Sequence, residues 1–86
     1  MPSIIVRRHR IFNDEVPALG VRPDSLVVAS LTEMTRSNPA GPLDTPWAGA
    51  ASMKVYTVVP RMDRVLVRGE IDWDDDLDVR ITVLVA

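Results

Sequence analysis

The sequence has no cysteine, and only one histidine, one phenylalanine and one tyrosine occur among its 86 residues. Without cysteine, the chain can build neither a disulfide framework nor a thiolate zinc site. One histidine cannot hold a transition metal unless carboxylates or neighbouring subunits contribute. Neither a Gly-x-Ser-x-Gly elbow nor a glycine-rich phosphate loop is present. We therefore predict that the protein is not an enzyme and uses no cofactor or metal.

Strong charge of one sign and long hydrophobic runs are also missing. Ten Lys and Arg residues face twelve Asp and Glu residues, a formal net charge of −2. Nucleic-acid binding usually needs a basic face, so this balance argues against it. No segment approaches membrane-spanning length, and residues 1–12 lack the apolar region of a signal peptide. We expect no nucleic-acid or membrane partner, and a cytoplasmic or virion- or particle-associated location.

Hydrophobic residues make up 47% of the chain, which is enough for one small core and a single domain over residues 1–86. Prolines and glycines indicate loops at 13–24 and, over a longer stretch, at 35–50. A helix has almost no support. The predicted fold is all-β, a small antiparallel β-sandwich of about five to six strands. The expected strands are 3–12, 25–34, 52–60, 65–73 and 77–85.

The last two strands show the clearest pattern. From Val65 to Trp73, and again from Leu77 to Val85, every second residue is apolar or glycine. Such alternation indicates half-buried antiparallel strands. We predict that the two strands form a hairpin with opposite charges paired across it, and the alternation assigns Trp73 to the core.

Five aspartates, at positions 72, 74, 75, 76 and 78, surround Trp73. Calcium needs about six to eight oxygen ligands, and the glycine and distant glutamate of an EF-hand loop are absent. If residues 74–76 form a hairpin turn, Asp72 and Asp78 can face each other and share a cation. The simpler interpretation is a solvated turn, because aspartate bonds its own backbone in turns.

A basic segment, "RRHR" at residues 7–10, lies near the other end of the chain. No aromatic residues interleave with it to stack on bases, so we interpret it as a charged strand face. His9 is then a surface residue rather than a catalytic base. Another hypothesis is that this segment meets the acidic turn of a neighbouring subunit.

Several strands carry apolar residues on both faces, whereas a two-layer sandwich buries only one face of each sheet. Adjacent aliphatic pairs occur at 27–28 and 58–59, and a run at 83–85. We predict that a second copy covers the spare face, which makes the protein a homo-oligomer with Val27, Val58 and Leu84 at the interface. The alternative is coverage by the 35–50 loop.

That loop carries Trp47, and Trp73 stands at the start of the acidic turn. Long irregular connections are often functional, and tryptophans near loops can stack on a sugar ring or anchor a protein. The candidate ligand-binding residues are Trp47, Trp73, Asp74, Asp75 and Asp76. For Trp47 the sequence is compatible with a position in the core as well as with one in the binding site.

The second half of the chain resembles the H-type lectin domain, loosely over residues 25–86 and best over 53–86. The segments that carry the resemblance are "SLVVASLTEM", "VYTVVP" with its Tyr-x-Val-x-Pro ending, "VLVRGEIDW" and "DDDLDVRITVLVA". It implies a small antiparallel sandwich that assembles as a trimer and binds sugars of the GalNAc type.

The sequence departs from that family at the sugar site. In the family a histidine follows the turn tryptophan, whereas Asp74 follows Trp73 here. The family's sugar-binding arginine has no counterpart in "AGAASM", and the 35–50 loop is longer. Trp73 is therefore the only matching contact residue.

Two functions follow as hypotheses. The preferred one is an oligomeric structural or assembly module, phage-related and similar to the trimeric β-domains of tail and fibre proteins. The alternative is a carbohydrate-binding module, in which Trp47 or Trp73 stacks on the sugar and the neighbouring aspartates accept hydroxyl hydrogen bonds. The expected partners are further copies of the chain, with a trimer favoured, and a glycan or a larger protein assembly.

Overall fold

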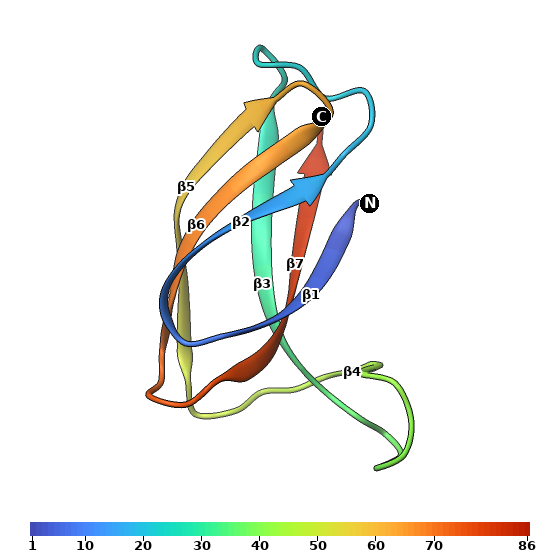
Figure 1. Ribbon diagram of the computed structural model, residues 1–86, viewed down its shortest axis with the longest axis vertical. Coiled ribbons are helices and arrows are strands. Elements are labelled where there is room, and N and C mark those ends of the chain that lie inside the picture. The colour runs from blue at the N-terminus through green and yellow to red at the C-terminus, as the bar shows by residue number, and fades with distance from the viewer.

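The computed structural model describes all 86 residues and contains seven β-strands and no helix, so no helix is available to cross a membrane (Figure 1). The all-β class is confirmed, with more strands than predicted. The strands are β1 (Ser3–Arg8), β2 (Arg10–Pro17), β3 (Val27–Thr35), β4 (Thr45–Pro46), β5 (Ser52–Arg61), β6 (Arg64–Asp72) and β7 (Leu77–Val85).

The strands form two antiparallel sheets that lie one in front of the other in Figure 1. Sheet A has the order β1-β7-β3-β4, and sheet B has the order β2-β6-β5. The central strands, β7 and β6, each have two neighbours in their own sheet. The fold is therefore a two-layer sandwich in which β6 and β7 face each other across the core.

The core lies between the inner faces of these two central strands. Val65, Val67 and Ile71 of β6 are at most 1% exposed, and alternate residues of β7 from Val79 to Val83 are fully buried. Burying each such side chain contributes about 1.5–3 kcal/mol before the entropy of ordering is subtracted. The predicted alternation of both strands is confirmed.

Gly69 interrupts the aliphatic inner face of β6 because Phe12 of β2 packs there. A Cβ atom at position 69 would lie 2.6 Å from the carbonyl oxygen of Lys54 and 2.9 Å from Cζ of Phe12. Real Cβ atoms do not approach other atoms so closely. Only glycine lets the Phe12 ring lie against this strand.

The predicted single strand over residues 3–12 is wrong, because the chain changes sheets in its middle. β1 belongs to sheet A and β2 to sheet B, and the chain crosses at His9 and Arg10, where Arg10 has a φ of 54°. The four basic residues 7–10 lie at this crossing, at the end of the sandwich, where Arg7, His9 and Arg10 are exposed and Arg8 is half-buried. β2 then continues to Pro17, so part of the predicted 13–24 loop is also a strand.

The predicted β6–β7 hairpin is wrong as well. β6 pairs with β2 and β5, whereas β7 pairs with β1 and β3, so residues 73–76 connect the two sheets instead of forming a hairpin turn. The expected ion pairs across a hairpin are accordingly absent. Trp73 follows the last residue of β6 and is 40% exposed, which corrects its assignment to the core.

The 35–50 segment forms an arm, defined by those residues, that leaves the sandwich at the lower right of Figure 1. β4 pairs only with the last two residues of β3, Met34 and Thr35. Asp44 accepts hydrogen bonds from the backbone and hydroxyl of Ser37 and from Thr45, which lower its pKa. Val28 and Leu84, on the outer face of sheet A, are 54% and 49% exposed, so the arm does not cover that face and the alternative of coverage by this loop is wrong.

Candidate functional site

The basic crossing (residues 7–10) and the acidic arch (residues 72–78) meet at the lower end of the sandwich. The two segments are far apart in the sequence, but β1 pairs with β7 and β2 pairs with β6, which brings their ends together. The predicted contact of these segments exists within one chain rather than between subunits. Its pairs are Arg7 with Asp78 (3.6 Å), His9 with Asp76 (2.6 Å) and Arg10 with both Asp72 (2.8 Å) and Asp74.

Arg8 of β1 forms the most buried ion pair, with Asp14 of β2. Its Nε and Nη2 atoms donate to the two carboxylate oxygens of Asp14 at 3.0 and 2.7 Å, a bidentate arrangement that is stronger than a single contact. The Asp14 side chain is 10% exposed and that of Arg8 is 40% exposed. The hydrogen bond to Asp14 raises the pKa of Arg8. This pair fastens sheet A to sheet B.

His9 and Asp76 form a contact on the surface, with Nδ1 and Oδ1 2.6 Å apart. The hydrogen bond to His9, and more weakly the charges of Arg7 and Arg8, lower the pKa of Asp76. A general acid needs a raised pKa and a dry pocket, whereas Asp76 is half-exposed. Asp76 is therefore poorly suited to donate a proton at neutral pH.

The acidic arch does not gather its carboxylates around a common point. Asp72 contacts Arg10 on one side, and Asp78 contacts Arg7 on the other. The chain has no group of three or more His, Cys, Asp or Glu side chains that could hold a metal ion. The hypothesis that Asp72 and Asp78 face each other across a turn is wrong.

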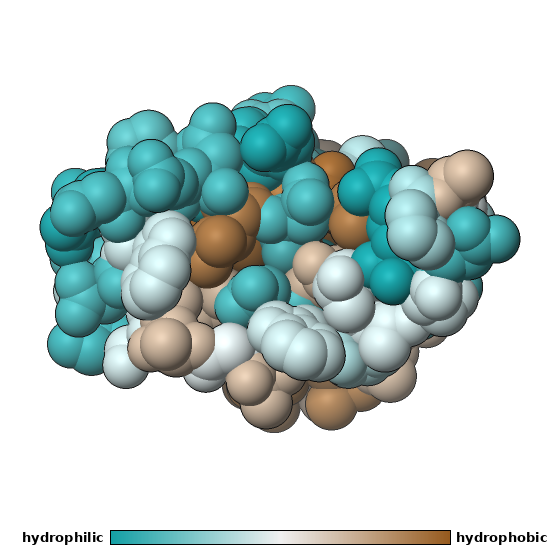
Figure 2. Space-filling view, turned by 90° about the horizontal axis from the view of Figure 1, so that it is seen from below, coloured by the Kyte–Doolittle hydropathy of each residue, from teal (hydrophilic) through white to brown (hydrophobic).

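Trp73 lines a hollow of about 360 Å³ at this end of the molecule. The hollow brings together three of the five predicted ligand-binding residues, Trp73, Asp74 and Asp75, with Arg10 and Asp72. The hydrogen bond to Asp74 raises the pKa of Arg10. Arg10 could not be predicted as a lining residue from the sequence, because it lies 62 residues from Asp72 along the chain. Figure 2 shows this end from below, with hydrophilic side chains gathered at the left, on the side of the arch.

The other two predicted ligand-binding residues lie elsewhere. Asp76 contacts His9 and does not line the hollow. Trp47 lies on the arm, where its side chain is 57% exposed and its backbone amide donates to the carbonyl of Glu33 at 2.8 Å. The two tryptophans therefore do not line a common hollow.

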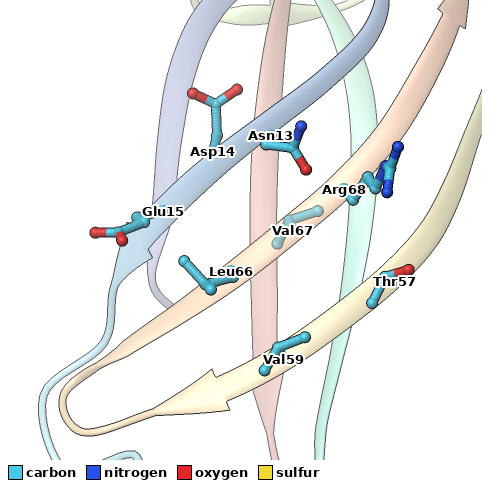
Figure 3. A pocket seen from close by; sticks show the side chains of 8 residues that line it. All are labelled: Asn13, Asp14, Glu15, Thr57, Val59, Leu66, Val67 and Arg68. Carbon is cyan, nitrogen blue, oxygen red and sulfur yellow. The ribbon is translucent and has the colours of Figure 1, made fainter.

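A second hollow, of about 420 Å³, lies on the outer face of sheet B (Figure 3). Leu66 and Val59 form its apolar part, and Arg68 lies beside them without any ion pair. Sequence patterns do not reveal this site, because it combines three strands through their register. Its lining residues are Asn13, Asp14, Glu15, Thr57, Val59, Leu66, Val67 and Arg68.

The three residues predicted at an oligomer interface lie on different faces. Leu84 is on the outer face of sheet A and is 49% exposed. Val27 and Val58 instead pack against the core, so their neighbours Val28 and Val59 are the residues that point outward.

Comparisons with protein-family models, with curated proteins and with solved structures found no match. The resemblance to H-type lectin domains stays a prediction, and the function is argued below from the geometry alone.

Proposed function

We propose that the protein is a non-catalytic module that works by associating with further copies of itself in an assembly, as tail- and fibre-type β-domains do. One observation carries this proposal: 13 large hydrophobic side chains are exposed, whereas only 12 residues of any kind are buried. The exposed residues are Met1, Ile5, Ile11, Leu19, Leu26, Val28, Trp47, Val55, Tyr56, Met62, Trp73, Leu84 and Val85.

Single exposed apolar residues are ordinary, so their grouping is the relevant feature. Val28 and Leu84 lie directly opposite each other on β3 and β7, and both point outward. Ile5 lies on the same face, on β1. The arm does not cover this face. A second copy would remove these side chains from water at about 25 cal/mol per Å² of apolar surface.

The charged groups support a non-catalytic role. The acids nearest to a histidine or an arginine are engaged in ion pairs, and the groups with shifted pKa values are exposed rather than enclosed. Catalytic acids and bases are typically tuned by burial in a cleft. Here the shifts come from ion pairs and hydrogen bonds between exposed or half-buried side chains.

The test is the mass of the purified protein in solution, measured by light scattering after size exclusion. A single chain has a mass of 9.5 kDa. We expect a multiple of that mass at micromolar concentration. A mass of one chain at every concentration would refute self-association as the function.

A second candidate, carbohydrate binding, is favoured by the hollow beside Trp73. A half-exposed indole ring can stack on a sugar, and the carboxylates of Asp74 and Asp75 can accept hydrogen bonds from its hydroxyls. The matched test is a glycan array with Trp73→Ala and Trp47→Ala. Binding that only Trp73→Ala abolishes, with the oligomer intact, would support this candidate, and an array without any signal would remove it.

A further inference from the structure

The outer face of sheet A is built in four rows across the strands, each fixed by the pairing register. We call the outward residues of β1, β7 and β3 the sheet A face. The first row is apolar, the second carries three hydroxyl groups, and the third places an arginine between an apolar and a hydroxyl side chain. These three rows are Val28 and Leu84; Ser30, Thr82 and Ser3; and Thr32, Arg80 and Ile5. The fourth row is charged and consists of Arg7 and Asp78.

The sheet A face carries less charge than the opposite face of the sandwich. The charged residues at outward positions of β1, β7 and β3 are Arg7, Asp78 and Arg80, whereas those of β2, β6 and β5 include Glu15, Lys54, Arg61, Arg64, Arg68 and Glu70. The cores of protein interfaces are depleted in Lys, Glu and Asp, and enriched in Arg. Of the two sheet faces, that of sheet A has the composition of an interface core.

Arg80, in the third row, has a hydrogen-bonding deficit. Its Nε atom is buried and has no hydrogen-bond acceptor, and its guanidinium group forms no ion pair. Ile5 and Thr32 stand on either side of it in the register. The one carboxylate among the outward residues of these strands, Asp78, has only a long contact with Arg7, at 3.6 Å. The buried Nε cannot itself be reached by a second copy, but the guanidinium group has no carboxylate partner within the chain, so its outer nitrogens are suited to an acceptor from outside.

We propose that the sheet A face packs against the same face of a second copy about a two-fold axis, and that Arg80 finds its acceptor there. This inference rests on the self-association proposed above and specifies its surface. A two-fold axis parallel to the strands sets the apolar row of each copy against that of the other, and it leaves the Arg80 row of one copy only one row away from the Asp78 row of the other. The face is therefore complementary to itself in both apolar character and charge.

The dimensions of the molecule also favour a sheet face over an end. The principal extents are 40 × 25 × 16 Å, and the shortest lies along the view of Figure 1, across the two sheets. An end of 25 × 16 Å is about half of the roughly 800 Å² that each partner buries in a standard interface. A face that measures up to 40 × 25 Å is large enough.

The experiment compares two matched variants by native mass spectrometry and sedimentation velocity. Leu84→Glu places a charge on the central strand of sheet A, and Leu66→Glu does the same on the central strand of sheet B. We expect the unaltered protein and Leu66→Glu to be dimers, and Leu84→Glu to dissociate with a Kd roughly 100-fold higher or more, because like charges would meet across the axis.

Arg80→Met tests the role of the guanidinium while keeping the length of the side chain. We expect about a tenfold weaker dimer, because the donated hydrogen bonds are lost. In the monomeric Leu84→Glu background the same change should leave the urea midpoint unaltered or raise it. A lowered midpoint there, with an unaltered dimer, would show that Arg80 serves its own fold and would overturn its assignment.

The remaining outcomes separate this inference from the proposed function. Three outcomes would overturn the two-fold contact through this face but leave self-association standing. The oligomer could persist in Leu84→Glu, it could dissociate in both variants, or it could have the mass of three chains. A monomer at every concentration overturns both.

Discussion

The pair of Arg8 and Asp14 predicts a measurable coupling between the two sheets. We consider Arg8→Met, which keeps the aliphatic stem and removes the guanidinium group. The Asp14 carboxylate is 10% exposed and receives both of its charged hydrogen bonds, at 3.0 and 2.7 Å, from Arg8. After the change, a nearly buried carboxylate has lost its partner, and the contact between the sheets is weakened.

The expected magnitude lies between two limits. A hydrogen bond to a charged group contributes roughly 1.5–3 kcal/mol, whereas a fully exposed ion pair contributes about 0–1 kcal/mol. The Arg8 side chain is 40% exposed, so solvent screens part of the interaction. We expect Arg8→Met to lower the free energy of unfolding by about 2 kcal/mol, which for a domain of this size lowers the Tm by roughly 8–16 °C.

The assay is a double-mutant cycle with Arg8→Met, Asp14→Asn and the double variant, each measured by urea denaturation in the monomeric Leu84→Glu background. We expect a coupling energy of about 1–2 kcal/mol. Arg7→Met is the matched control, because Arg7 is 72% exposed and its contact is long, and it should stay within about 0.5 kcal/mol of its parent. If the effects of Arg8→Met and Asp14→Asn on the free energy of unfolding add within about 0.3 kcal/mol in the double variant, the coupling is refuted.

Three further predictions concern the core and the lower end. Gly69→Ala should lower the free energy of unfolding by about 2–3 kcal/mol in calorimetry, because its Cβ would meet the Lys54 carbonyl and Phe12; a neutral result would contradict that packing. By NMR titration, Asp76 should ionise below its ordinary pKa of about 3.9. Its contribution to the free energy of unfolding is therefore complete above that pH and is lost as the pH falls through the lowered pKa. His9→Ala should return the pKa of Asp76 toward its ordinary value, and an unchanged pKa would refute the contact. Because the arch carboxylates diverge, millimolar calcium or a chelator should leave the Tm unchanged, and a rise with calcium would refute this geometry.

The sequence was sufficient to predict the fold class and the inner faces of the last strands. Alternation in β6 and β7 reports on burial alone, so Val65, Val67 and Ile81 could be assigned to the core. It cannot report which strand lies beside which, because an inner face is apolar whether its neighbour is in the same sheet or across the core. The predicted hairpin of β6 and β7 is therefore wrong, because the two strands belong to different sheets.

The crossing between β1 and β2 could not be predicted for a different reason. Sheet changes are usually recognised from glycine or proline, and neither occurs in residues 3–12. Arg10 adopts a positive φ without being glycine, and the ion pairs to Asp72 and Asp74 hold it there. Its contribution to the Trp73 hollow depends on that crossing, so the sequence identified only the acidic half of the site.

Sedimentation equilibrium of the unaltered protein, from nanomolar to high micromolar concentration, tests most directly whether the exposed sheet faces are sheltered by another copy. We predict a reversible transition from one chain to two, with a limiting mass of twice 9.5 kDa. A mass that stays at that of one chain over the whole range would show that Val28, Leu84 and Ile5 remain in water, and would contradict the proposed self-association.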